Sequence, residues 1–336
     1  MTEEFTVIHN GNRRQLMAAG LGLLGAAAMP ARAQSQGYPN RPVTLVVPFA
    51  PGGSVDISGR AMADRLARVL GQTVIVDNRA GAGGAIGSSF VARAPADGYT
   101  LVVASQTTHV VNPAVTPQLS YNAEADFAPI TLIDRLANVL LVNASLPVKT
   151  FEEFVSYVRA HPGKWNYASS GNGSVAHLSM ELLKAKLGLD IAHVPYKGAG
   201  PALNDMLGGL VQATWNNLTS NLSSITSGQL RALAVAAPRR VAQLPAVPTF
   251  EELKLPDLNL TSWTGLAAPA RTPEPIVKRL YEAMRTVLSD PATRQAWEAR
   301  GAILPEPLTP EQYRQEIAQR IQFFKSVVQK HKIVLA

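Results

Sequence analysis

The feature of this sequence that most constrains its fold is the regular alternation of short apolar runs with amphipathic segments. Residues 43–49 form a continuous apolar run of strand length, and the following stretch 57–70 places apolar side chains on one helical face. Further strands are expected at 73–76 and 100–104. Continuous apolar strands are typical of parallel sheets whose two faces are covered by helices. The alternation therefore predicts right-handed βαβ units and an α/β fold with parallel or mixed sheets.

The same alternation starts again near Phe127, so a second α/β unit is expected. Its strands are expected at 130–133, 139–142, 166–168, 193–196, 211–215 and 230–236, with helices at 151–160, 175–187 and 201–207. No long Pro/Ser linker separates the units, and the chain is expected to cross between two lobes near 135–139 and 231–236. This predicts one lobe from residues 34–135 and 236–336, a second lobe from residues 136–235, and a cleft at the hinge.

The C-terminal third is expected to be mostly helical. Thr309 and Gln312 have the spacing of a capping box, with proline at the first helical position. Apolar residues at helical spacing follow from Tyr313 onward. This pattern predicts a long terminal helix that packs on the core.

The first 33 residues have the features of an export signal. Arg13 and Arg14 precede an apolar stretch at 16–29, and residues 31–33 have the A-x-A form that signal peptidase cleaves. A membrane-spanning helix needs about 20 residues, and the apolar stretch is shorter than that. The paired arginines favour the twin-arginine route, with the Sec route as the alternative. The mature protein is therefore expected in the periplasm.

Composition and spacing exclude several kinds of site. The chain has no cysteine, so a disulfide, a thiolate nucleophile and a cysteine-bound metal are all excluded. Aromatic residues make up only 6% of the chain and the net charge of +7 is spread along it, which argues against nucleic-acid binding. The histidines are scattered, and Gly81, Gly83 and Gly87 stand too far from the preceding strand for a dinucleotide fingerprint. We expect neither a metal nor a cofactor.

Four polar loops follow predicted strands and are expected to meet in one cleft. In open α/β sheets, ligands bind beyond the carboxyl ends of the strands, where loop amides and helix N-termini converge. Glycine lets backbone N–H groups approach a ligand, and serine hydroxyls add donors. The predicted ligand-binding residues of these loops are Phe49, Ala50, Pro51, Gly52, Gly53, Ser54, Asp56, Ser105, Thr107, His109, Ser169, Ser170, Gly171, Asn172, Gly173, Ser174, Lys197, Gly198 and Ala199. Together they predict a site for a small anion.

Motifs for catalysis are sparse. The sequence contains neither G-x-S-x-G nor H-E-x-x-H. Ser174 and His177, with Asp56 to orient the ring, could form a catalytic triad, although their spacing does not establish a shared geometry. We expect a binding protein rather than an enzyme, with a secreted serine hydrolase as the alternative.

A series of motifs along nearly the whole mature chain resembles the Bug family. The motifs are PFAPGGSVD at 48–56, YASSGNGS at 167–174, HVPYKGAGPALNDMLGG at 193–209, LPAVPTFEE at 244–252 and W-x-G-L-x-A-P at 263–269. Bug proteins are periplasmic solute receptors of tripartite tricarboxylate transporters. The resemblance implies a type II periplasmic-binding-protein fold whose two lobes close on a small carboxylate, and delivery of that carboxylate to membrane permease subunits or to a sensor. We expect a monomer.

One strand end departs from the family pattern. Family members commonly have an acidic residue in the sequence Phe-Asp-x-Leu, whereas this chain has asparagine at Asn216, after Trp215. An acidic side chain would repel a ligand carboxylate or attract a ligand ammonium, whereas the Asn216 amide can donate a hydrogen bond to a carboxylate. We therefore add Asn216 to the predicted ligand-binding residues and expect a carboxylate without an α-ammonium group.

Overall fold

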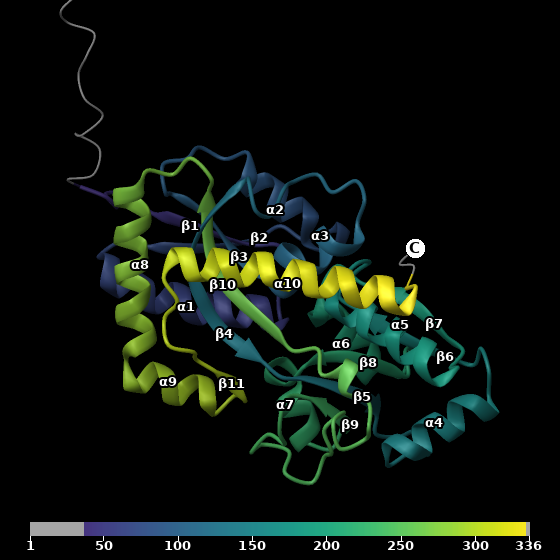
Figure 1. Ribbon diagram of the computed structural model, residues 1–336. Helices are drawn as coiled ribbons and strands as arrows, with labels where there is room; N and C mark the ends of the chain where they lie inside the picture. The colour runs from purple at the N-terminus through teal and green to yellow at the C-terminus, as the bar shows by residue number, and fades with distance from the viewer. Residues whose placement is uncertain (1–36, 334–336) are drawn as a thin grey trace, which may run out of the picture. The chain divides into compact units, whose positions relative to one another are not determined.

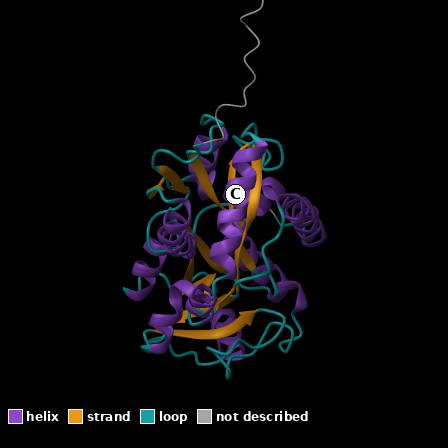
Figure 2. Ribbon diagram, turned by 90° about the vertical axis from the view of Figure 1, so that its left-hand side faces the viewer, coloured by secondary structure: helices purple, strands orange, loops and turns teal. Residues whose placement is uncertain are grey.

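The strands of the protein form two separate β-sheets, each flanked by helices (Figures 1 and 2). The structure, a computed structural model, describes residues 37–333, and all the elements below belong to one compact unit that begins at Pro39. The expected α/β fold is confirmed. The predicted export signal lies outside the described residues.

The first sheet has six strands in the order β11-β4-β10-β3-β1-β2. The strands are β1 (Val43–Val47), β2 (Val74–Asn78), β3 (Thr100–Ser105), β4 (Phe127–Leu136), β10 (Ser262–Pro269) and β11 (Ala302–Ile303). Strand β1 pairs in parallel with β2 and β3, whereas β10 lies antiparallel between β3 and β4. The sheet is therefore mixed: a strand from the C-terminal third lies beside the N-terminal βαβ units.

The second sheet has five strands in the order β7-β6-β8-β5-β9. The strands are β5 (Asn138–Asn143), β6 (Trp165–Ser169), β7 (Ile191–Pro195), β8 (Ala213–Asn217) and β9 (Leu230–Ala236). Strand β6 pairs in parallel with β7 and β8, and β5 runs antiparallel to β8 and β9. The chain passes from the first sheet to the second at Ala137, between β4 and β5, and returns through the segment between β9 and β10.

Helices follow most of the strands. They are α1 (Ser54–Leu70), α2 (Ala85–Ala92), α3 (Asn112–Val115), α4 (Phe151–Ala160), α5 (Val175–Leu187), α6 (Ala199–Leu207), α7 (Leu218–Thr226), α8 (Glu274–Ser289), α9 (Pro291–Glu298) and α10 (Pro310–His331), with short 3₁₀ helices at η2 (Ala82–Gly84) and η4 (Pro256–Leu258) and a π-helical turn at Thr107–Val111. The predicted capping box of Thr309 and Gln312 starts α10. Helix α10 buries Tyr313 and Phe324 and contacts β4 and the π-helical turn (Figure 1).

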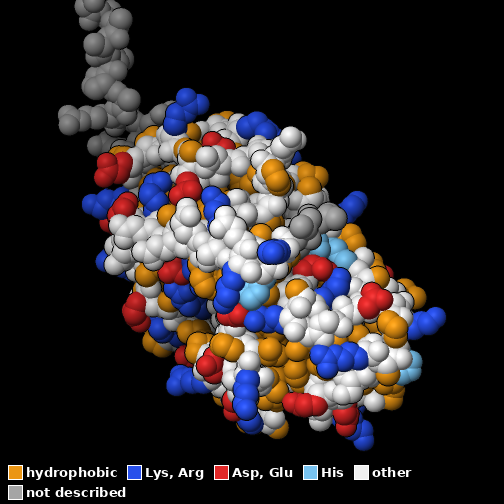
Figure 3. Space-filling model, turned by 45° about the vertical axis from the view of Figure 1, so that its right-hand side comes forward, with side chains coloured by type: hydrophobic (Ala, Val, Ile, Leu, Met, Phe, Trp, Pro, Cys, Tyr) orange, Lys and Arg blue, Asp and Glu red, His pale blue; other side chains and the backbone are white. Residues whose placement is uncertain are grey.

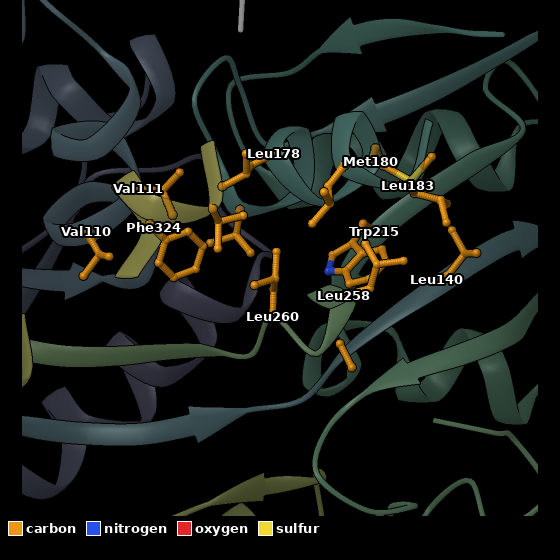
Figure 4. Close-up of a cluster of buried hydrophobic side chains, with 14 of the residues drawn as sticks. Val110, Val111, Leu140, Leu178, Met180, Leu183, Trp215, Leu258, Leu260 and Phe324 are labelled. Carbon is orange, nitrogen blue, oxygen red and sulfur yellow. The ribbon is translucent and has the colours of Figure 1, made fainter. Parts of the chain in front are cut away.

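A continuous cluster of buried apolar side chains connects the two sheets (Figure 4). Val110 and Phe324 belong to elements beside the six-stranded sheet, and Leu140 and Trp215 lie on strands of the five-stranded sheet. Leu260, in the segment that returns to β10, lies between these groups. The two sheets therefore share a core, and any motion that separates them must rearrange part of it.

The surface carries charges of both signs. Figure 3 shows lysines and arginines interspersed with acidic residues on one face of the molecule, with no extended area of a single sign. Such a pattern gives no electrostatic track for a nucleic-acid backbone on that face. Within residues 37–333, no helix combines the length and the apolar character that a bilayer-spanning helix requires.

Candidate functional site: a polar pocket between the two sheets

A pocket lies between the two sheets, where loops from both meet. It is lined by residues that follow β1, β3 and β6, by the end of β8 and by the start of β10. Its volume is about 50 Å³, which is room for a few waters. Among the described residues, no lysine, arginine, aspartate or glutamate lines it.

The sequence predicted part of this lining. The predicted residues that line the pocket are Phe49, Gly53, Ser54, Ser105, Thr107, Ser170, Ala199 and Asn216. Other polar and aromatic residues that line the pocket were not predicted: Gln106, Asn138, Trp215, Asn217, Ser262, Trp263 and Thr264. The missed residues come mainly from β8, β10 and the crossing at Ala137, which no glycine-rich loop marks in the sequence.

Helix N-termini line the pocket, among them those of α1 and α5. Gly53, Ser54 and Val55 at the start of α1 line it, and so do Val175 and Ala176 at the start of α5. The first N–H groups of a helix have no partner within the helix and carry partial positive charge. The pocket therefore offers backbone donors suited to an anion without using a charged side chain.

Asp56 is buried in the first turn of α1, but it faces its own loop. Its carboxylate accepts hydrogen bonds from the Gly52 N–H at 3.0 Å, from Asn78 Nδ2 at 2.8 Å and from Arg60 at 3.1 Å. Burial raises the pKa of Asp56, but the bonds from Arg60, Gly52 and Asn78 outweigh it and hold the pKa below its ordinary value. Asp56 thus fixes the loop after β1 and does not line the pocket.

A chain of hydrogen bonds joins the two sheets beside the pocket. Ser54 Oγ, on α1, donates to Asn217 Oδ1 at the end of β8. Asn217 Nδ2 donates to Asn138 Oδ1 at 2.6 Å, and Asn138 Nδ2 donates to the Leu260 carbonyl at 2.6 Å. Asn216 Oδ1 accepts from the Asn217 N–H at 2.8 Å, which leaves Asn216 Nδ2 as a donor for the pocket.

Backbone contacts also close the gap between loops of the two sheets. The Ala50 N–H donates to the Lys197 carbonyl at 3.0 Å, and the Val175 N–H donates to Thr107 Oγ1 at 3.3 Å. Two further close contacts between loops of the two sheets require glycine. A Cβ on Gly200 would lie 2.1 Å from the Pro51 carbonyl oxygen, and a Cβ on Gly83 would lie 2.4 Å from the carbonyl oxygen of Asn172. In this structure the loops of the two sheets are therefore in direct contact beside the pocket.

The remaining predicted residues support these loops. Pro51, Gly52 and Gly198 make the close backbone contacts between the loops after β1 and β7. Lys197 is exposed, and its carbonyl rather than its ammonium group makes the contact. Asn172 is also exposed, and its carbonyl faces Gly83.

His109 was expected in the cleft, but the structure places it in the apolar core. Its ring lies 4.6 Å from that of Phe127 and 6.3 Å from that of Tyr121, measured between centroids. Burial lowers the pKa of His109 to about 3, so the ring is neutral. The π-helical turn after Ser105 directs this side chain inward, which the sequence did not indicate.

Two stacked histidines hold the loop between β6 and α5. The rings of His177 and His193 lie 3.8 Å apart, and their planes differ by 17°. His193 Nε2 lies 2.7 Å from Ser169 Oγ, and Ser169 Oγ donates in turn to the Gly171 carbonyl at 3.1 Å. The Gly173 N–H donates to His177 Nδ1 at 3.2 Å. The histidines thus fix the turn that leads to α5 and its N-terminus.

The residues of the conceivable catalytic triad do not come together. Ser174 Oγ accepts from the His177 backbone N–H at 3.2 Å as the N-cap of α5, while His177 Nδ1 is taken by Gly173. Asp56 is engaged with Arg60 and does not contact either residue. Within residues 37–333, no group of three or more acidic, histidine or cysteine side chains is placed to bind a metal ion.

Comparison with known proteins agrees with this architecture. Residues 59–333 match the sequence model of the family described as Tripartite tricarboxylate transporter family receptor. Protein BugT of Bordetella pertussis is 37% identical over 320 residues, which cover 95% of this chain and 98% of BugT. The family description is that of a receptor and not of an enzyme.

Solved structures are similar over nearly their whole length. The periplasmic binding protein BugD has a TM-score of 0.84 at 33% identity, covering 88% of this chain and 99% of BugD. Rpa4515 of R. palustris, solved with adipate, has a TM-score of 0.84 at 36% identity and covers 88% and 99% of the two chains. MatC from Rhodopseudomonas palustris, with bound malate, has a TM-score of 0.83 at 36% identity and covers 87% and 100%. These likenesses confirm the expected periplasmic-binding-protein fold, and the chain belongs to the tripartite tricarboxylate transporter receptor family.

Proposed function

We propose that this protein is an exported receptor that captures a small carboxylate in the pocket between its two sheets and delivers it to the membrane permease subunits of a tripartite tricarboxylate transporter. The receptor family and two relatives of 36% identity, solved with adipate and with malate, support a carboxylate as the ligand. A serine hydrolase has no support, because the candidate triad is not formed.

The observation that carries this proposal is the meeting of two helix N-termini at an uncharged pocket. Val55 of α1 and Ala176 of α5 both line it, and the first N–H groups of a helix have no partner within the helix itself. A carboxylate there is stabilised by the helix dipoles and by hydroxyl donors such as Ser54 and Ser170. Because no charged side chain holds the carboxylate, its release leaves no buried cation without a partner. This suits a receptor that binds its ligand reversibly.

We further propose that residues 34–135 and 236–336 form one lobe and residues 136–235 the other, with the hinge at Ala137 and the return segment. The ligand would bind between the lobes of a monomer and hold them closed. Export by the twin-arginine or the Sec route follows from the signal at residues 1–33 and agrees with the periplasmic relative BugD.

A thermal-shift screen tests the proposal. The mature protein is heated with mono-, di- and tricarboxylates and with aromatic acids, and each stabilising compound is then titrated by calorimetry. A compound at 100 times its dissociation constant should add about 2.7 kcal/mol of stability. One carboxylate is expected to bind at one site per chain and to be recovered unchanged. Stabilisation by none of the acids, or turnover of a generic ester that Ser174→Ala abolishes, would contradict the proposal.

A further inference from the structure

A second groove, larger than the polar pocket, lies beside the segments that connect the two sheets. Its volume is about 1000 Å³, at the upper end of the range of about 300–1000 Å³ that is typical of small-molecule pockets. Residues of the crossing at 135–137, of the segment 237–245 after β9 and of the segment 298–303 line it. Leu136 lines both the polar pocket and this second groove. The two spaces therefore share the crossing between the sheets.

Both sheets contribute walls to the second groove. Ile303 belongs to β11, which pairs with β4 at the edge of the six-stranded sheet. Ala237 is buried in an apolar cluster with strands of the five-stranded sheet. Gln243 Nε2, in the segment after β9, donates to the Glu298 carbonyl at the end of α9 at 2.7 Å and connects the two walls. A molecule in the second groove would therefore contact segments of both sheets.

Most of the surface that lines the second groove is apolar. Leu136, Val241 and Pro245 contribute to it together with Ile303, whose side chain is 64% exposed. A single exposed isoleucine is ordinary, but this one is continuous with a groove of apolar side chains. Each methylene group that a ligand buried there would raise its affinity about fourfold. The groove therefore suits a ligand with an apolar body.

The charged side chains of the lining are three arginines and one glutamate, Glu298. Arg135 and Arg240 are each paired with a glutamate outside the lining, at 3.0 Å and 2.9 Å. Arg239 is exposed and has no ion pair or hydrogen bond among residues 37–333. A guanidinium group binds a carboxylate through two parallel N–H groups. Charge complementarity therefore favours an anionic ligand that pairs with Arg239.

We propose that the second groove binds a small amphipathic anion, with its apolar body along Val241 and Ile303 and its acid group on Arg239. This site goes beyond the proposed function, because it is separate from the polar pocket. An occupant that contacts both sheets stabilises the arrangement of the sheets in this structure. A carboxylate in the polar pocket would stabilise the same arrangement, so the two ligands should strengthen each other's binding by the same factor.

Calorimetry with decanoate, kept below the concentration at which it forms micelles, tests the site. One decanoate should bind per chain, at least about tenfold more tightly than hexanoate, because two additional buried methylene groups account for that factor. Decanoate should also bind at least about tenfold more tightly than decyltrimethylammonium, which has an equally long chain and a positive charge. Tighter binding of the cation would assign the groove to Glu298 instead of Arg239 and would overturn the proposal.

Variants in the groove are compared with matched variants outside it. Arg239→Glu replaces an attraction with a repulsion and should weaken decanoate binding about tenfold or more. Ile303→Asn removes apolar contact and should weaken it about threefold or more. Arg271→Glu and Ile86→Asn make the same changes at exposed positions outside the groove and should alter the affinity less than about twofold. All four side chains are exposed, so the melting temperature of the ligand-free protein should stay nearly unchanged. Equal decanoate affinity in all four variants would refute the site.

Two measurements identify other occupants of the second groove. Sedimentation with vesicles of phosphatidylglycerol separates a free acid from a lipid surface, and vesicle binding without decanoate binding would overturn the proposal. Analytical ultracentrifugation tests for a second copy of the chain. A dimer that Ile303→Asn dissociates would assign the groove to that second copy and would also overturn the proposal.

The coupling between the two sites is measured with adipate and malate as probes for the polar pocket. Saturating decanoate should tighten the binding of whichever probe binds, by the factor by which that probe tightens decanoate. Weaker or unchanged binding of the probe would show that the occupied groove does not favour the arrangement of the sheets described here. Failure of every di- and tricarboxylate to bind would contradict the proposed function, whereas the decanoate titrations would still decide whether the second groove is a site.

Discussion

At the scale of single residues, we expect a change of charge at Asn216 to have a large effect on the affinity for a carboxylate. It lines the pocket, and its Oδ1 is already taken by the Asn217 N–H, so its Nδ2 can donate to a carboxylate. Asn216→Asp replaces that donor with a negative charge. Two like charges about 4 Å apart repel by about 4 kcal/mol at an effective dielectric constant of about 20. Calorimetry should show that the substitution weakens carboxylate binding at least about tenfold.

The control for Asn216→Asp makes the same charge change at an exposed position. Gln118→Glu adds one negative charge outside the pocket and should leave the affinity unchanged. Unchanged affinity for Asn216→Asp would refute the role of this side chain. Tighter binding of aspartate than of succinate by the wild type would refute the expectation of a ligand without an α-ammonium group.

Asp134 is a second residue with a large expected effect, on stability rather than binding. Its buried carboxylate accepts from Ser58 Oγ at 2.6 Å, from Thr264 Oγ1 at 2.6 Å and from Trp297 Nε1 at 3.0 Å. It thus joins α1, β10 and α9 to β4. Asp134→Ala leaves four buried donors unpaired, the Thr264 N–H among them, at about 1–3 kcal/mol each. Urea unfolding should show a loss of at least about 3 kcal/mol, whereas Asp64→Ala, which removes an exposed carboxylate, should change stability by less than about 0.5 kcal/mol.

The sequence indicated some site residues and not others for a physical reason. Loops such as 49–56 and 169–174 have glycines and hydroxyls that mark a turn at a strand end, and both loops contribute to the pocket lining. Gln106, Asp134 and Trp263 have no such local pattern. Their surroundings depend on the pairing of β3 and β4 with β10, which is distant in the sequence, so only the folded chain brings their partners together.

At the scale of elements, the turn between β6 and α5 should make the protein sensitive to acid. Burial is the main reason that the pKa of His177 and the pKa of His193 fall to about 4. The positive charge of Lys184 also lowers both pKa values, whereas the negative charge of Glu181 raises both. In the unfolded chain these histidines titrate near 6.5. As the pH falls from about 6.5 to about 4, the unfolded chain therefore binds protons that the folded protein does not. Stability should be full above pH 6.5 and fall through this window.

Urea unfolding between pH 7.5 and pH 4.5 measures this effect. His193→Gln can still donate to Ser169 but does not titrate, so its stability should fall less steeply with acid than that of the wild type. His177 and the core residue His109 remain and should preserve part of the slope. An equal slope for the wild type and His193→Gln would contradict the assignment. The aspartates with lowered pKa, such as Asp56, lose their contribution only below pH 4.

Elements with a strong local pattern were predicted well, and elements defined by distant partners were not. The apolar run that begins at Val43 and the strand at 230–236 are confirmed as β1 and β9, and the capping box at Thr309 is confirmed as the start of α10. Strand β10 was missed, although it lies inside the six-stranded sheet. Its sequence contains Gly265 and ends in proline, features that disfavour a strand. Tyr313 of α10 explains the glycine, because a Cβ there would lie 2.0 Å from the Tyr313 hydroxyl.

At the scale of the whole molecule, we expect closure of the proposed lobes to depend on two sets of contacts, those in the shared apolar core and those between the loops. The shared apolar core around Leu260 and Trp215 resists separation of the sheets and keeps them close at the proposed hinge. At the loops, the contacts between the sheets include the backbone hydrogen bond from Ala50 to Lys197 and the bond from the Val175 N–H to Thr107. We expect that the ligand supplies the remaining stabilisation of the closed form, since it contacts both sheets.

Gly200 allows this proposal to be tested without altering a pocket side chain. Gly200 lies in the first turn of α6, and a Cβ there would meet the Pro51 carbonyl oxygen at 2.1 Å in the closed arrangement. Alanine is otherwise better than glycine in a helix, so Gly200→Ala should not lower the stability of an open form. It should weaken carboxylate binding about tenfold or more and enlarge the radius of gyration measured by X-ray scattering with ligand present. Gly208→Ala, at the other end of α6, meets only ordinary contacts of 3.5 Å or more and should change neither quantity. Wild-type affinity in Gly200→Ala would mean that binding does not require the loops to close as they do here.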